Sequence, residues 1–232
     1  MKWEAQRRQV LETAREMLRL GLVAGSSGNV SLQLPEEGGK GLLAITPSQK
    51  PYVELQPQDI VVIDHEAEPV EGELVPSSES LLHIAVYRAR ADVGAVIHTH
   101  PVFASVLAVA GLELPPILDE LVLAVGGPVQ LAQYAFPGTQ GLAEAAQQAL
   151  GERNAVLLRN HGLLTVGRTA SQALDVAVLV ERASEVFLYA RLLGAVNKLP
   201  DEVVSIEQEL FRMRRSSEGL ASSQGSRERA PW

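Results

Sequence analysis

Hydrophobic and polar positions along this chain predict helices and strands in mixed order. Between Trp3 and Leu20, apolar side chains recur every three or four residues among charged ones, which predicts an amphipathic helix. Residues 30–34 alternate between apolar and polar, which is typical of a half-buried strand. Residues 93–101 are mainly apolar and end at a proline, which predicts a buried strand that stops there.

The same patterns predict further elements along the rest of the chain. Strands are expected at 42–46, 59–64, 70–74, 129–132, 155–158 and 163–166, and helices from near Ser78 to Tyr87 and at 102–110, 139–150, 169–193 and 201–214. The helix at 169–193 has an apolar stripe wide enough to contact neighbours on more than one side. We expect one domain over residues 1–215, and a disordered tail over residues 216–232, which are polar and lack periodicity.

Composition narrows the class of protein. The chain has 232 residues, 46% of them hydrophobic, which suits a single sizeable core. A formal charge of -8 without a basic stripe argues against binding nucleic acid. There is no cysteine, so any metal must be bound by His, Asp or Glu. The charged N-terminus is unlike a signal peptide and no stretch is apolar enough to span a membrane, so we expect a cytoplasmic protein with no membrane partner.

Histidines at predicted strand ends are the first candidates for chemistry. His98 and His100 lie two positions apart on one strand, so their side chains share a face and could bind one metal ion. His161 lies in a glycine-bounded turn and could be a third ligand, because three neutral imidazoles with an open position form a catalytic metal site. A pair of buried, hydrogen-bonded histidines is commoner for this spacing alone, so both interpretations stay open at this point.

Two segments offer groups suited to an anion. The glycine-rich loop 25–29 could expose backbone N–H groups toward an anion, although from the loop alone an ordinary hairpin turn is the favoured interpretation. Ser77 and Ser78 begin a predicted helix, whose N-terminal amides favour negative charge. Glu79 follows them, and considered alone it would be a helix-start acid that faces water.

Taken together, five motifs resemble the class II aldolase/adducin family, and particularly its L-fuculose-1-phosphate aldolase branch. In chain order they are Ser27-Gly28-Asn29, Thr46-Pro47-Ser48, Pro76-Ser77-Ser78-Glu79, His98-Thr99-His100-Pro101 and Asn160-His161-Gly162. The resemblance spans about residues 5 to 195. It implies a three-layer α/β/α sandwich around a largely antiparallel central sheet, assembled as a fourfold-symmetric homotetramer with active sites between subunits.

The resemblance also implies a reaction and its residues. Zinc would be bound by His98, His100 and His161, although other divalent first-row metals have overlapping ligand preferences. Glu79 would be the catalytic acid/base. The substrate phosphate would be held by Gly28, Asn29, Ser48, Ser77 and Ser78. The implied activity cleaves a ketose 1-phosphate, such as L-fuculose 1-phosphate, to dihydroxyacetone phosphate and an aldehyde.

Two departures from the family pattern bear on the substrate. Gln49, also expected among the substrate-binding residues, stands where the family usually has glycine, so a bulky side chain lies beside the expected phosphate site. The donor could therefore carry a differently placed phosphate, or none. The segment 116–126 has no tyrosine, whereas the fuculose-phosphate branch places one there, contributed by the neighbouring subunit, to protonate the aldehyde oxygen. Glu120, or less favourably Asp119, could take this role, or both could form ion pairs at a subunit boundary.

Three other functions are considered for the same fold, two of them enzymatic. A methylthioribulose-1-phosphate dehydratase would also use a glutamate as acid/base, and Glu120 keeps this alternative open. A ribulose-phosphate 4-epimerase is a further enzymatic alternative. A non-enzymatic, adducin-like scaffold should have lost its metal ligands, but the three histidines and Glu79 are all present, which disfavours it.

Overall fold

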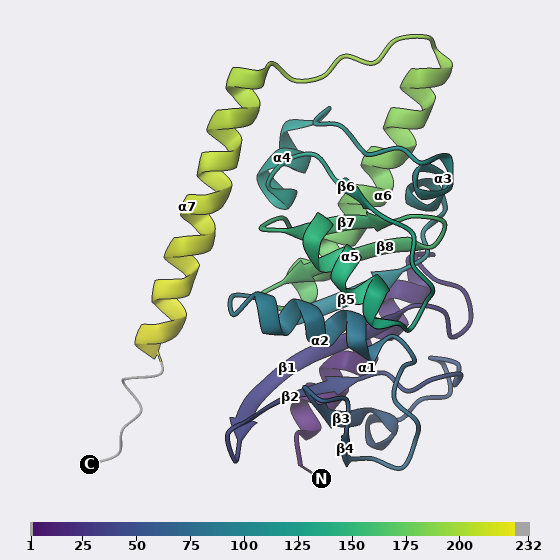
Figure 1. The fold of residues 1–232 in the computed structure, drawn as a ribbon, viewed down its shortest axis with the longest axis vertical. Helices are drawn as coiled ribbons and strands as arrows, with labels where there is room; N and C mark the ends of the chain where they lie inside the picture. Colours follow the sequence, from purple (N-terminus) through teal and green to yellow (C-terminus); the bar gives the residue numbers. More distant parts are fainter. Residues whose placement is uncertain (1, 226–232) are drawn as a thin grey trace.

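The computed structural model describes residues 2–225, with side chains as far as Ser217, and shows one eight-stranded sheet between two layers of helices (Figure 1). The strands follow the order β4-β3-β2-β1-β5-β8-β7-β6, and within residues 2–225 only β6 and β7 pair in parallel. They are β1 Asn29–Glu37, β2 Lys40–Ile45, β3 Val61–Asp64, β4 Pro69–Glu71, β5 Ala95–Thr99, β6 Gln130–Ala132, β7 Ala155–Leu158 and β8 Gly162–Gly167. This arrangement confirms the predicted largely antiparallel sandwich.

Helices cover both faces of the sheet and enclose two separate hydrophobic cores. They are α1 Glu4–Arg19, α2 Ser80–Ala89, α3 Val102–Ala110, α4 Asp119–Val125, α5 Gln140–Leu150, α6 Ala170–Leu192 and α7 Asp201–Gly225, with a 3-10 turn at Pro57–Asp59. Buried residues of α1, α3, α4 and α6 share one core, whereas those of α2 and α5 share the other. Within residues 2–225, no helix combines the length and apolarity needed to cross a membrane.

Several predicted boundaries differ from the structure: β1 runs to Glu37 where we expected an end at 34, and β4 spans Pro69–Glu71 where we expected 70–74. The strand expected at 59–64 begins as the 3-10 turn Pro57–Asp59, because Pro57 favours the first position of a helical turn, and β3 begins only at Val61. The helix expected from near Ser78 begins at Ser80, with Glu79 at its N-cap position. Glu79 therefore lies at the junction between the serine turn and α2.

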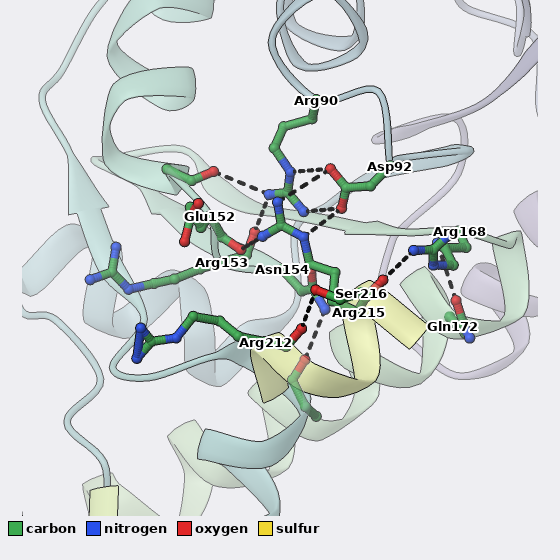
Figure 2. A network of polar contacts seen from close by, with 12 residues as sticks. Arg90, Asp92, Glu152, Arg153, Asn154, Arg168, Gln172, Arg212, Arg215 and Ser216 are labelled. Atoms are coloured by element: carbon green, nitrogen blue, oxygen red, sulfur yellow. Dashed lines mark hydrogen bonds and ion pairs between the residues drawn. The ribbon is translucent and has the colours of Figure 1, made fainter. Parts of the chain in front are cut away.

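The last helix is longer than predicted. Expected to end at Arg214, α7 runs to Gly225, so residues 216–225 are helical where we expected a disordered tail. Residues 226–232 of that expected tail lie outside the described part of the chain. Figure 2 shows how α7 is anchored: Arg215 contacts Asp92 at 3.0 Å, and Arg90 contacts the same carboxylate at 2.8 Å. These long-range contacts hold α7 at Arg215, where its apolar periodicity has already ended.

Strand β5 brings together the segments that carry the candidate chemistry. It pairs with β1 on one side, where Asn29 lies opposite His98. On the other side it pairs with β8, where Thr99 lies opposite Leu163, two residues after His161. The start of β1, the end of β5 and the β7–β8 turn therefore meet at one edge of the sheet, the one along which these strands begin or end.

Candidate metal and substrate site

Three histidines converge at this edge. The Nε2 atom of His98 lies 2.8 Å from Nε2 of His100 and 3.2 Å from Nε2 of His161. Ligand atoms of all three lie within 4.8 Å of one another. Nitrogen ligands of a tetrahedral zinc ion would be about 3.3 Å apart, given a metal–nitrogen distance of roughly 2.0–2.1 Å. The spacing of these imidazoles is therefore close to that of a ligand shell.

The protonation state of His98 suits a metal ligand. Its Nδ1–H donates to the Leu163 carbonyl across 3.0 Å, which leaves the Nε2 lone pair facing the other histidines. Burial lowers the pKa of His98 well below its usual value, and the neighbouring His100 and His161 lower it further. Burial also lowers the pKa of His100. Both rings are therefore neutral at pH 7, which is the form that binds metals.

A tight turn directs His161 toward the other two histidines. Asn160, which tolerates the left-handed region better than most residues, has a φ of 55° there. At Gly162, an added Cβ would lie 2.4 Å from the Thr99 carbonyl oxygen and 2.7 Å from Cδ2 of His100. Only glycine therefore allows the turn to approach the end of β5 this closely.

Glu79 lies against the histidines instead of facing water. Its Oε2 is 3.3 Å from Nε2 of His98, and its Oε1 is 3.3 Å from Nε2 of His161. The residue is only 8% exposed, and Oε1 is buried without a hydrogen-bond partner. An unsatisfied carboxylate oxygen beside imidazole lone pairs fits the binding of a cation. A donor set of imidazoles and one carboxylate fits a divalent first-row metal.

The two segments with the expected phosphate-binding serines, 46–48 and 76–78, lie side by side. Pro47 and Pro76 form an isolated antiparallel bridge. Across it, Ser48 N–H donates to the Val75 carbonyl, and Ser77 N–H donates to the Thr46 carbonyl. These backbone amides are thus already used, so an anion would be bound by the serine hydroxyls and the N-terminal end of α2.

Gly28 and Asn29, which are expected to bind phosphate, make structural contacts within the chain. Gly28 has a φ of 73°, and an added Cβ would lie 2.5 Å from the His98 carbonyl oxygen, so glycine allows the loop to pack on β5. The Asn29 side chain donates to Glu79 Oε2 across 2.9 Å and also contacts His83. Its amide is therefore committed to Glu79 in this structure.

Gln49 occupies a backbone conformation that suits glycine. Its φ is 60°, in the left-handed region, which agrees with the family's usual glycine at this position. The next residue, Lys50, contacts Asp59 at 2.8 Å, so its charge is already paired.

Glu120 is not brought to the histidines within one chain. It lies exposed in the first turn of α4, and no hydrogen bond or ion pair among the described residues joins it to the cluster. Its neighbour Asp119 interacts with Glu207 of α7. The described contacts of one chain therefore give Glu120 no catalytic role.

Sequence reasoning missed two buried residues that support the site. Tyr52 is 1% exposed, and its hydroxyl donates to the Gly28 carbonyl across 2.6 Å, which fixes the glycine loop. Burial raises the pKa of Tyr52, so the hydroxyl stays protonated as a donor. His83 contacts Asn29 from α2, and its spacing of four residues after Glu79 was a usable signal, because such residues share a helix face.

Comparisons with known proteins agree with this geometry. A profile described as "Class II Aldolase and Adducin N-terminal domain" matches residues 8–188. The chain is 36% identical to 5-deoxy-D-ribulose 1-phosphate aldolase of Bacillus thuringiensis serovar kurstaki, covering 87% of this chain and 93% of that one. It is 37% identical to 5-methylthioribulose-1-phosphate/5-deoxyribulose-1-phosphate aldolase of Rhodospirillum rubrum, covering 90% and 91%. A solved structure of L-fuculose 1-phosphate aldolase matches with a TM-score of 0.84 at 34% identity, covering 90% and 96%.

Proposed function

This chain belongs to the class II aldolase and adducin family, whose aldolases are lyases, and on that premise we propose that it is a zinc-dependent aldolase of ketose 1-phosphates. The products would be dihydroxyacetone phosphate and an aldehyde. One observation carries the proposal: the Nε2 atoms of His98, His100 and His161 and the Glu79 carboxylate face one another at the spacing of a metal shell.

The chain's own residues supply three functions. The hydroxyls of Ser48, Ser77 and Ser78, with the N-terminal end of α2, would hold the substrate phosphate. Zinc held by the three histidines would act as a Lewis acid, stabilising negative charge on substrate oxygens. Glu79 would deliver a proton to C3 of the substrate as the C3–C4 bond breaks, and would remove that proton in the reverse direction.

A second acid/base must take the proton from the C4 hydroxyl as the aldehyde forms, and must return it to the aldehyde oxygen in the reverse direction. We assign this role to Glu120 of a neighbouring subunit, with Asp119 as the less favoured candidate. Support comes from the missing tyrosine in segment 116–126 and from the exposure of Glu120 on α4. A second residue from another subunit would also explain why one chain holds only part of the machinery.

We therefore propose a homotetramer. Apolar side chains of α3 and α6 remain exposed in the single chain, including Val102 at 64%, Val109 at 64% and Tyr189 at 53%. Burying such a surface between subunits would release its contact with water. Mass measurement by light scattering tests this proposal, and a monomer at micromolar concentration would refute it. The cytoplasm is the compartment we propose, on composition alone.

The substrate class follows from the relatives. Two of them act, by name, on 5-deoxyribulose 1-phosphate, one on methylthioribulose 1-phosphate as well, and a matched structure on L-fuculose 1-phosphate. We propose L-fuculose 1-phosphate or a 5-deoxypentulose 1-phosphate for this chain. Dehydration of methylthioribulose 1-phosphate is the second candidate activity, because that compound is named for a relative at 37% identity and Glu120 is present. Epimerisation of a ribulose phosphate is a third.

A panel assay separates these activities. Each sugar phosphate is incubated with the zinc-loaded protein, and dihydroxyacetone phosphate is detected by coupled reduction. Its appearance from a ketose 1-phosphate supports the aldolase. Loss of water, or inversion at C4, without dihydroxyacetone phosphate would instead identify the dehydratase or the epimerase.

Variants test the assigned roles. His100→Ala should lose bound metal and turnover together, whereas Glu79→Gln should keep the metal and lose turnover. His65→Gln is the matched control, because His65 lies outside the cluster, and it should keep both. Full activity in His100→Ala would refute the metal mechanism, and an unfolded Glu79→Gln protein would make Glu79 a structural residue.

A further inference from the structure

Beyond the metal cluster, a row of polar side chains runs through the interior between the sheet and α2. Its members are Glu79, Asn29, His83, Ser31 and Tyr87. Their exposures are low: His83 and Ser31 are fully buried, and Asn29 and Tyr87 are each 3% exposed. Burying polar groups is costly unless each is hydrogen-bonded, so a row this complete indicates a function.

The directions of these hydrogen bonds follow one from another. An ionised carboxylate only accepts, so Asn29 Nδ2–H donates to Glu79 Oε2 across 2.9 Å. Asn29 Oδ1 must then accept, so His83 Nε2–H donates to it. His83 Nδ1 accepts from Ser31 Oγ–H across 2.7 Å, and Tyr87 OH donates to Ser31 across 2.8 Å. Every donor in the row therefore points toward Glu79.

The row fixes only one of the two carboxylate oxygens. Oε2 accepts from Asn29, whereas Oε1 is buried without a hydrogen-bond partner and lies 3.3 Å from His161 Nε2. An anchored oxygen is poorly placed to exchange a proton with substrate. The free oxygen, by contrast, keeps its lone pairs toward the cluster.

We propose that His83, Ser31 and Tyr87 are positioning residues, which act through Asn29 to hold Glu79 so that Oε1 is the oxygen that exchanges the substrate proton. This rests on the proposed aldolase function. Because β1 supplies Asn29 and Ser31, and α2 with its N-cap residue Glu79 supplies the other three members, the row also locks α2 to the sheet in one register.

Kinetics of truncated variants test the proposal. Ser31→Ala and His83→Leu should each slow the exchange of the hydroxymethyl proton of dihydroxyacetone phosphate with D₂O by about tenfold or more. The KM and the bound zinc should not change, because neither residue touches substrate or metal. His83→Gln, whose amide can donate to Asn29 and accept from Ser31, should recover part of the rate.

A matched control separates positioning from general loss of packing. Ser184→Ala also removes a fully buried hydroxyl, which donates to the Val180 carbonyl across 2.7 Å, but it lies on α6 away from the row. It should lose stability comparably and keep the exchange rate. Wild-type rates in folded Ser31→Ala and His83→Leu proteins would overturn the proposal, as would a rate loss of equal size in Ser184→Ala. If His83→Leu does not fold, these other variants decide.

A second readout does not depend on activity. Nitrogen-15 NMR of the His83 ring in the metal-free protein should show the Nε2–H tautomer, and Ser31→Ala should alter the Nδ1 resonance. A ring protonated on Nδ1 would reverse the row and refute the assignment of Oε1. If the wild type catalyses no exchange while the tautomer is as expected, the aldolase function fails and the row of hydrogen bonds stands.

Discussion

Acid should destabilise this protein through His83, whose ring is buried and neutral. Burial, as the larger cause, and nearby His98 lower the pKa of His83 from 6.5 to about 3. Between pH 6.5 and about 3, His83 therefore binds a proton in the unfolded chain but not in the folded protein. The stability associated with His83 is complete above pH 6.5 and is lost as pH falls from 6.5 toward 3.

The size of this loss can be worked out at pH 5. Each pH unit between the two pKa values is worth about 1.4 kcal/mol, and pH 5 lies about 1.5 units below the unfolded value, so the loss is about 2 kcal/mol. This is a large part of the roughly 5–15 kcal/mol that stabilises a typical domain.

Urea unfolding at about pH 7.5 and pH 5, with a chelator present, measures this loss when wild type is compared with His83→Gln. His98 and His100 also have lowered pKa values, but both proteins retain them, so their contributions cancel in the comparison. The free energy of unfolding should fall by about 2 kcal/mol more in wild type than in the variant. An equal fall in both proteins would show that His83 is not held neutral, and the reasoning from its burial would be wrong.

Three further substitutions test the account elsewhere in the fold. Gly162→Ala should push His100 aside and lower the zinc retained after dialysis, whereas Gly141→Ala, whose new Cβ meets nothing closer than 3.7 Å, should not; equal zinc contents would contradict the packing argument. Gln49→Gly should raise the free energy of unfolding by about 0.5–1 kcal/mol in urea. Glycine removes the cost of the left-handed φ of 60°, and this gain exceeds the stability lost through the greater entropy of the unfolded chain. A lower free energy of unfolding would mean that the Gln49 side chain makes stabilising contacts. Burial and the neighbouring carboxyl group of Asp119 raise the pKa of Glu207 above 4.5. The free energy of unfolding should therefore fall as pH rises from 4.5 through that raised pKa, because Glu207 ionises first in the unfolded chain. Glu207→Gln should abolish this loss, and a variant with the wild-type pH dependence would refute the assignment.

The sequence was sufficient for the features that depend on local spacing. Side chains two apart on a strand share a face, so His98 and His100 were expected together, and their Nε2 atoms are 2.8 Å apart. Hydroxyl residues before apolar runs predicted helix starts, and Thr139 does cap α5 through its side chain. These features follow from periodicity and capping, which neighbouring residues determine.

Features that depend on sheet register were not predictable in this way. Ser31 and His83 are 52 residues apart, and they meet only because β1 packs beneath α2. The bridge between Pro47 and Pro76, which precedes the left-handed Gln49, likewise joins segments that no local pattern connects.

The C-terminal helix shows the same limit. Apolar periodicity weakens after Arg214, which led us to end the helix there. Arg215 then anchors the helix through Asp92, a residue from the distant α2–β5 connection (Figure 2). Long-range ion pairs of this kind leave no local signature in the sequence.

Proton exchange at the hydroxymethyl group of dihydroxyacetone phosphate in D₂O, followed by NMR, tests the central claim most directly because it requires no knowledge of the aldehyde. The account predicts stereospecific loss of one proton, stopped by a chelator, restored by zinc and absent in Glu79→Gln. No exchange by the wild-type protein with zinc demonstrably bound would contradict it.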